Sequence, residues 1–130
     1  MNIPSGFGTL TPYIFADDAE SYLQFLENAL GGVIVGSTRR GDGKIANCQM
    51  QLGDTMIMIS EASEKFPASR AAFYFYVGNA DAAMDHATKA GGRLVMEVAD
   101  MPYGDRQGGV SDPSGNIWWI SQRLSDQPYY

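Results

Sequence analysis

The sequence predicts an α+β fold built from two copies of one unit, in which a strand is followed by a helix and three further strands. Residues 11–32 and 73–92 share one order: a short apolar run, an acidic or amide residue, an amphipathic stretch and a pair of glycines. Within each amphipathic stretch the apolar residues recur at helical spacing. Three short segments separated by turn-forming residues follow each glycine pair, which is typical of β-strands. We therefore expect a βαβββ module twice.

In the first copy, the strand is expected to begin at Thr11. Asp17 is the expected cap of the following helix, and Glu20, three residues later, is expected to reach back to it as in a capping box. Gly31 and Gly32 end that helix, because glycine readily adopts the left-handed conformation needed there. The remaining strands of this copy are expected at residues 33–39, 44–52 and 55–60.

In the second copy, the strand is expected to begin at Phe73, and Asn79 is the expected helix cap. The segment Asp112–Gly115 matches a type I turn, with proline second and glycine fourth. The last three strands are expected at residues 94–98, around 106–110 and at 117–122. We treat residues 1–130 as one domain, with a first module at about 8–62, a linker at about 63–69 and a second module at about 70–124.

Composition narrows the classes of partner. A chain of 130 residues, 45% of them hydrophobic, is long enough to bury one core. The net charge of −6 repels nucleic acid, and no apolar run approaches the length that crosses a membrane. The single cysteine excludes an internal disulfide, and the first residues lack a secretory signal. We therefore expect a cytoplasmic protein that binds neither nucleic acid nor membranes.

Three phrases carry a family resemblance: Thr11–Phe15, Gln51–Ser60 and Tyr103–Asn116. Together with the doubled element order, they resemble the glyoxalase/bleomycin-resistance/dioxygenase superfamily, or vicinal oxygen chelate proteins, and most of all its PhnB-like branch. The resemblance covers roughly residues 8–124. It implies that the paired modules form an open, cupped barrel and that the chain assembles as a homodimer. It does not fix the function, because one fold hosts enzymes and binding proteins alike.

The resemblance also places the metal ligands of the family's enzymes, which come from the first and last strand of each module. Here these positions hold Thr11, Met58, Ala72 and Trp119. None offers the imidazole or carboxylate that zinc, nickel or iron needs. PhnB-like relatives also carry histidine where this chain has Asn47 and Asn116. No metal site and no cofactor are therefore expected.

Other reactive side chains are expected to be structural. His86, the only histidine, lies off the apolar stripe of its helix and is expected to face solvent. Cys48 is expected to be a small buried residue. The pairs Glu61–Glu64 and Asp100–Asp105 are expected to be solvated loop carboxylates. No catalytic residue is assigned.

The two tryptophans are adjacent, so in a strand they must point to opposite faces. If Trp119 occupies a family ligand position, it faces the cup, and Trp118 belongs to the core. The same alternation turns aromatic, thioether, amide and hydroxyl side chains into the cup, a mixture typical of pockets for small organic molecules. The predicted ligand-binding residues are Thr11, Tyr13, Phe15, Asn47, Gln49, Met58, Ser60, Tyr74, Tyr76 and Trp119.

The favoured hypothesis is a metal-free binding protein of the bleomycin-resistance type, which sequesters or senses an aromatic or cationic organic ligand. One alternative is a divergent metal-dependent lyase, isomerase or dioxygenase whose ion is held by shifted residues such as Glu61 or Asp105. Another is a structural or protein-interaction module in which a dimer contact fills the cup.

Overall fold

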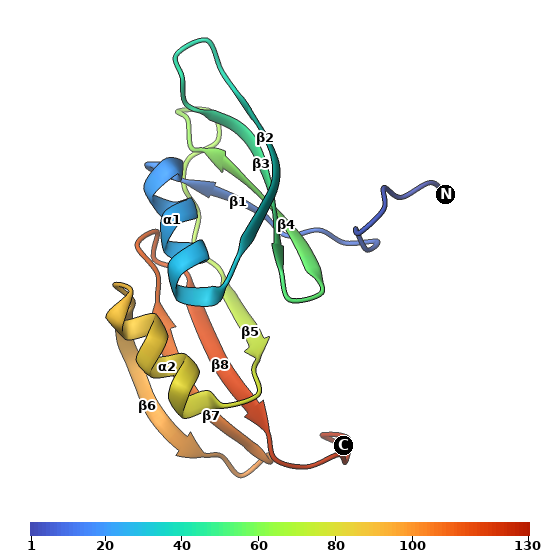
Figure 1. Cartoon of the computed structure of the whole chain (residues 1–130), viewed down its shortest axis with the longest axis vertical. Helices are drawn as coiled ribbons and strands as arrows, with labels where there is room; N and C mark the ends of the chain where they lie inside the picture. The colour runs from blue at the N-terminus through green and yellow to red at the C-terminus, as the bar shows by residue number, and fades with distance from the viewer. The chain divides into compact units, whose positions relative to one another are not determined.

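The computed structural model describes residues 1–130 and divides them into two compact units, Met1–Ser69 and Arg70–Tyr130. Each unit has the predicted βαβββ order, which confirms the α+β fold class (Figure 1). Unit 1 contains β1 (Tyr13–Ala16), α1 (Ala19–Leu30), β2 (Val33–Arg39), β3 (Ile45–Leu52) and β4 (Thr55–Glu61). Unit 2 contains β5 (Ala72–Tyr76), α2 (Ala80–Lys89), β6 (Arg93–Asp100), β7 (Asp105–Ser111) and β8 (Ile117–Arg123).

The two sheets have equivalent topologies. Their strand orders are β1-β4-β3-β2 in unit 1 and β5-β8-β7-β6 in unit 2. In each, the first strand of the unit pairs in parallel with the last, and the other pairings are antiparallel. Each sheet keeps two edge strands, so neither closes into a barrel on its own. Neither helix is long and apolar enough to span a lipid bilayer.

Helix α1 begins one residue later than predicted. Asp18, and not Asp17, is the cap, and its carboxylate accepts hydrogen bonds from the backbone N–H and the hydroxyl of Ser21. The backbone of Asp18 is left-handed, with φ 53°. The Glu61 carboxylate, at the end of β4, accepts hydrogen bonds from the backbone N–H groups of Asp18 and Ala19, at 2.9 and 3.0 Å. A distant strand therefore decides which of two adjacent aspartates caps the helix, and Glu61 is not the loop carboxylate that was predicted.

The predicted capping box is also wrong, because Glu20 pairs with Arg39 of β2 at 2.7 Å instead of reaching back to the cap. The cap of α2 agrees with the prediction: Asn79 accepts a hydrogen bond from the Ala82 backbone N–H at 3.1 Å. Both helices are followed by a left-handed glycine, Gly31 in the first unit and Gly91 in the second.

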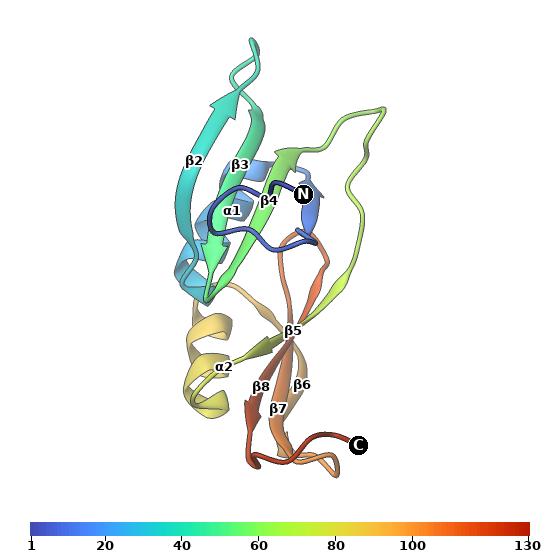
Figure 2. The ribbon, with the colours of Figure 1, turned by 90° about the vertical axis from the view of Figure 1, so that its right-hand side faces the viewer.

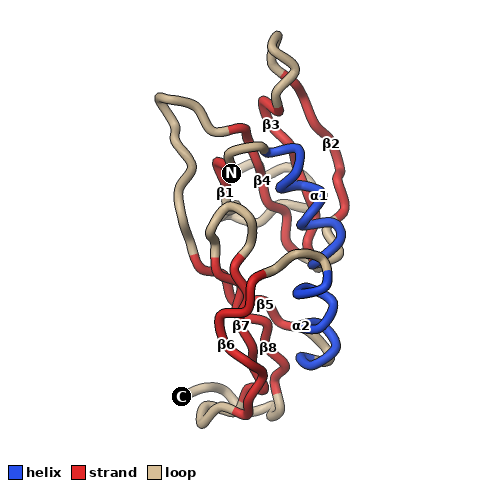
Figure 3. Tube along the Cα trace, turned by 90° about the vertical axis from the view of Figure 1, so that its left-hand side faces the viewer, coloured by secondary structure: helices blue, strands red, loops and turns tan.

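In each unit the helix covers one face of the sheet, as Figure 3 shows. In unit 1 this side holds the core, in which Cys48 is buried as predicted. The main buried residues there are Tyr22, Leu26, Cys48, Met50, Ile57 and Ile59.

Trp118 anchors the core of unit 2. Only 4% of its surface is exposed, and its ring lies 4.6 Å from that of Phe73, centroid to centroid. Its indole N–H donates to the Asp112 carboxylate at 2.8 Å. Asp112 opens the predicted turn, which the Gly115 backbone N–H closes by bonding to the Asp112 carbonyl at 3.0 Å. Asn116 is buried and accepts from the Ala71 backbone N–H at 2.9 Å, so it links β5 to this turn.

Candidate functional site

Nine of the ten predicted site residues lie on the strand faces that the helices leave uncovered, six in unit 1 and three in unit 2, whereas Thr11 lies just before β1. In unit 1, Tyr13 pairs with Met58 and Met58 pairs with Gln49 across three neighbouring strands. Residues in register share a face, and their chain neighbours are buried on the helix side. We call this surface the helix-free face of unit 1, and it comprises Tyr13, Phe15, Asn47, Gln49, Met58 and Ser60.

Tyr13 is the exposed aromatic side chain of this face. Its hydroxyl is hydrogen-bonded to the Ser60 hydroxyl, which also contacts the Ala46 carbonyl at 2.7 Å. The Asn47 amide donates to the Tyr13 oxygen at 3.4 Å. The hydroxyl is thus fixed while 44% of the residue remains exposed, so its ring is presented to solvent in a defined orientation.

The aromatic surface continues beyond Tyr13. The Phe15 ring lies 4.9 Å from the Tyr13 ring and 5.5 Å from the ring of Phe66, centroid to centroid. Phe66 belongs to the segment after β4 and stacks nearly parallel to Phe15, at 15°. The three rings form a row along one side of the face, and Phe66 is its most exposed member.

A pocket of about 330 Å³ lies on the same face. Thr11, Gln49 and Met58, three of the predicted site residues, form one wall. The other wall belongs to residues 2–9, which run across β3 and β4 on the side away from α1 (Figure 2). The sequence reasoning missed this segment. Its apolar residues Ile3 and Phe7, placed ahead of the first strand, were the available signal.

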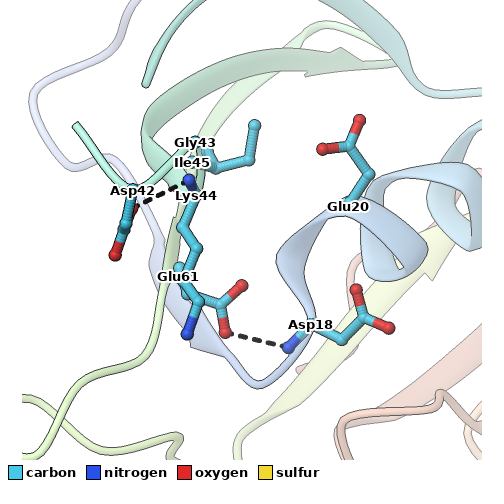
Figure 4. A pocket seen from close by; sticks show the side chains of 7 residues that line it. All are labelled: Asp18, Glu20, Asp42, Gly43, Lys44, Ile45 and Glu61. Atoms are coloured by element: carbon cyan, nitrogen blue, oxygen red, sulfur yellow. Dashed lines mark hydrogen bonds between the residues drawn. The ribbon is translucent and has the colours of Figure 1, made fainter. Parts of the chain in front are cut away.

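A second hollow, of about 410 Å³, lies where α1 begins and is rich in carboxylates (Figure 4). These carboxylates do not converge on one point. Glu61 is held by the start of the helix, Glu20 by Arg39 at 2.7 Å, and Asp42 by the backbone N–H of Lys44 at 2.9 Å. Each is therefore already engaged in a structural contact.

In unit 2, Trp119 pairs with Tyr74 on one side and with Gly109 on the other, so the three lie in a row on the helix-free face. A Cβ on Gly109 would lie 2.6 Å from the indole, which therefore packs directly against this glycine. A Cβ on Gly108 would instead meet Met84 of α2, at 2.7 Å. Two adjacent glycines thus admit the helix on one face and the indole on the other. We define the helix-free face of unit 2 by Tyr74, Tyr76, Asp105, Gln107, Trp119 and Ser121.

Asp105 is the largest departure from the sequence prediction for this unit. It is not a loop carboxylate: it begins β7 and has no exposed surface. Its carboxylate accepts hydrogen bonds from the hydroxyls of Tyr74 and of Tyr129, the latter at 2.7 Å. Arg123, its partner in register on β8, donates to it at 3.0 Å. The predicted residue Tyr74 is therefore part of a tyrosine–carboxylate–arginine cluster built around the buried Asp105.

The cluster determines the charge states of its members. Burial acts to raise the pKa of Asp105, but the hydrogen bonds from Tyr74, Tyr129 and Arg123 outweigh it, so this pKa lies below its usual value. Burial and the contact with Asp105 raise the pKa of Tyr74. Burial, followed by the contacts with Tyr76 and Asp105, raises the pKa of Tyr129. At neutral pH the carboxylate is ionised and the phenols are protonated.

A second polar chain runs beside this cluster. Gln107 donates to the Ser121 hydroxyl at 2.7 Å and accepts from the Tyr103 hydroxyl. Sequence reasoning named neither Gln107 nor Ser121. Both residues alternate with a neighbour on the helix side, Gly108 for Gln107 and Ile120 for Ser121. This alternation, on strands that the sequence already predicted, was the signal that could have placed them on this face.

The remaining candidates are dispersed. His86 is exposed on α2, as expected, and burial raises the pKa of the Cys48 thiol. No group of three or more histidine, cysteine, aspartate or glutamate side chains is placed to hold a metal ion. Glu61 and Asp105, the residues considered as shifted metal ligands, are bound to a helix start and to an arginine respectively.

Comparison with known proteins supports the fold and indicates the family. The model of the glyoxalase/bleomycin resistance protein/dioxygenase superfamily matches residues 7–120. An uncharacterized protein of Mycobacterium bovis is 26% identical over 128 residues, covering 90% of this chain and 84% of its own length. An uncharacterized protein of Mycobacterium tuberculosis is also 26% identical over 128 residues, covering 90% of this chain and 75% of its own.

Three solved structures are similar throughout. TioX from Micromonospora sp. ML1 has a TM-score of 0.76 at 21% identity, with 90% of this chain and 100% of that chain covered. TnmS3 from Streptomyces sp. CB03234, an antibiotic-binding protein, has a TM-score of 0.73 at 20% identity, with 95% and 98% covered. The PhnB protein from Bacillus cereus has a TM-score of 0.70 at 17% identity, with 88% and 99% covered.

Proposed function

The chain belongs to the glyoxalase/bleomycin resistance protein/dioxygenase superfamily, and from this premise we propose that it is a small-molecule-binding protein that works without a metal ion. It sequesters or senses a planar organic compound, aromatic or cationic, on the helix-free faces of its sheets. The contacts are the predicted ones: Thr11, Tyr13, Phe15, Asn47, Gln49, Met58 and Ser60 in unit 1, and Tyr74, Tyr76 and Trp119 in unit 2.

The pocket of about 330 Å³ in unit 1 is the observation that carries this proposal. Ligand pockets typically enclose about 300–1,000 Å³, with mostly apolar walls and a few polar groups that set orientation. Here Met58 and Phe7 supply apolar surface, while Thr11 and Gln49 supply hydroxyl and amide groups. The exposed rings of Tyr13 and its neighbours adjoin this wall and suit stacking on a flat ligand.

The chemistry of the side chains supports binding without a metal. The family resemblance puts Thr11, Met58, Ala72 and Trp119 at the positions where the family's metalloenzymes place their ligands, and none is an imidazole or a carboxylate. The similarity to TnmS3, an antibiotic-binding protein, is compatible with this function. A cationic ligand also suits the net charge of −6.

A thermal-shift screen of aromatic and cationic compounds tests the proposal, because a compound that binds only the folded state raises the melting temperature. The variant Thr11→Trp fills the pocket and is expected to abolish the shift given by a hit that binds in unit 1. The control Thr55→Trp adds the same ring at an exposed position outside the pocket and is expected to keep it. Tightly held stoichiometric metal in the purified protein, or no hit across a broad panel, would contradict the proposal.

A further inference from the structure

Tyr129 lies after the last strand of unit 2, yet its side chain is bound to the helix-free face of that unit. The tail leaves β8 on the side of the sheet away from α2 (Figure 3). The Tyr129 hydroxyl lies 2.7 Å from the Asp105 carboxylate and 2.6 Å from the Tyr76 hydroxyl. The guanidinium carbon of Arg123 lies 4.2 Å from the centre of the Tyr129 ring. One phenol thus makes three specific contacts.

The hydrogen bonds to this phenol have a fixed direction. Tyr129 has one hydroxyl proton, which it donates to the Asp105 carboxylate. The Tyr76 hydroxyl must therefore donate to the Tyr129 oxygen. The site presents one acceptor, one donor and a flat cation to stack on, which is a complete set of partners for a hydroxyl group on an aromatic ring.

The surrounding charges select a neutral ring. Asp105 is fully buried and ionised, so it repels a phenolate. Arg123 lies over the ring and disfavours a cationic one. Arg123 is also held by its ion pair with Asp105, at 3.0 Å, and by the Tyr103 carbonyl, at 2.6 Å. These two contacts do not involve the tail, so we expect Asp105 and Arg123 to stay paired when the tail leaves.

The tail is held by individual contacts and not by strand pairing, and its first backbone N–H, that of Leu124, donates to the Gly104 carbonyl at 2.9 Å. No strand pairing includes residues 124–130, and 42% of Tyr129 is exposed. Besides Tyr129, the Gln127 carbonyl is the other contact between tail and cluster, accepting from Arg123 at 2.7 Å. A ligand of matching chemistry therefore has few contacts to displace.

We propose that Asp105, Tyr76 and Arg123 form a binding site for a neutral hydroxyaromatic ligand, and that Tyr129 occupies this site as a tethered counterpart of that ligand. Tail and ligand compete for one carboxylate. The inference rests on the proposed function for the existence of an external ligand, and for the helix-free face of unit 2 it specifies a ring bearing a free hydroxyl group.

The probe that tests this is 4-methylphenol, which is the tyrosine side chain as a separate molecule. Tethering keeps the Tyr129 ring at an effective concentration in the millimolar range, so the wild-type chain should bind the probe poorly. Removing the ring in Tyr129→Ala should tighten binding about tenfold or more, measured by calorimetry or ligand-observed NMR. The control Tyr130→Ala removes a neighbouring exposed ring and should bind as the wild type does.

A second probe isolates the hydroxyl group. 4-Methylanisole has the same ring but no proton to donate to Asp105, and it should bind Tyr129→Ala about tenfold more weakly than 4-methylphenol does. Adding Tyr76→Phe to Tyr129→Ala should weaken the binding of 4-methylphenol severalfold. If Tyr129→Ala does not fold, as judged by circular dichroism, Tyr129→Phe keeps the ring, lacks the hydroxyl, and should still bind the phenol more tightly than the wild type.

Equal affinity of Tyr129→Ala and the wild-type chain for 4-methylphenol would overturn the inference. Equal affinity of Tyr129→Ala for 4-methylphenol and for 4-methylanisole would overturn it as well. Failure here and failure of the proposed function are distinguishable. The pocket-filling variant Thr11→Trp lies in unit 1 and should leave phenol binding to Tyr129→Ala unchanged. A ligand screen without a hit, together with tight binding of 4-methylphenol by Tyr129→Ala, would refute only the proposed pocket in unit 1. A hit that Thr11→Trp abolishes, together with no gain in phenol binding by Tyr129→Ala, would refute only the hydroxyaromatic site in unit 2.

Discussion

The variant Gly109→Ala tests where the indole of Trp119 lies. An ideal Cβ on this glycine would be 2.6 Å from Cζ3 and 2.9 Å from Cε3 of the indole. Carbon atoms in ordinary contact are about 3.5–4.0 Å apart, so the ring must move by about 1 Å or swing away. Because Trp119 is only half-buried, it has room to move toward solvent. We expect the free energy of unfolding to fall by about 1 kcal/mol, the low end for overpacking.

That loss corresponds to a fall in melting temperature of about 3–6 °C for a chain of this size. Near-ultraviolet circular dichroism should change as well, because the ring leaves its fixed position. Gly78→Ala is the matched control: this glycine belongs to the same unit, has no atom within 4 Å of the added carbon, and should melt at the wild-type temperature or above. If both variants retain the wild-type spectrum and melting temperature, the indole does not lie on Gly109.

Two further predictions concern stability. Trp118→Phe removes the hydrogen bond to the buried Asp112 carboxylate and leaves a cavity, so urea denaturation should show a loss of about 2–4 kcal/mol, while Trp119→Phe should cost less than half as much. The pKa of Asp105 is lower in the folded chain than the usual value for an aspartate, so its contribution to stability is complete above that usual value and is lost as the pH falls through the folded pKa. The stability difference between the wild type and Asp105→Asn should therefore shrink on acidification below about pH 4, and a difference that stays constant would contradict this role of the carboxylate.

The sequence predicted the features that depend on neighbouring residues. Alternation along a strand is a local property, so the adjacent Trp118 and Trp119 could be placed on opposite faces without knowing the rest of the fold. The same holds for the cap Asn79 and for the turn that begins at Asp112, whose geometry is set within four residues. The order of elements followed from these local signals, repeated twice along the chain.

The features that could not be predicted from the sequence depend on residues far apart in the chain. Asp17 and Asp18 are equally suited to cap a helix, and Glu61 of a distant strand makes the choice. Asp105 looked like a solvated charge because its partners, Tyr74 and Tyr129, lie 31 and 24 residues away. A period of two assigns a face to a side chain but does not say which other segments cover that face.

Segments outside the sheets distinguish two otherwise equivalent units. Residues 2–9 cross the helix-free face of unit 1 and leave a pocket beside them, so a ligand there has room without displacing any residue. In unit 2 the Tyr129 phenol already uses the buried carboxylate, so a ligand there has to replace it. Binding to unit 1 should accordingly be insensitive to substitution of Tyr129, whereas binding to unit 2 should depend on it. We therefore expect two sheets with the same topology to differ in ligand preference because of the short segments that lie over them.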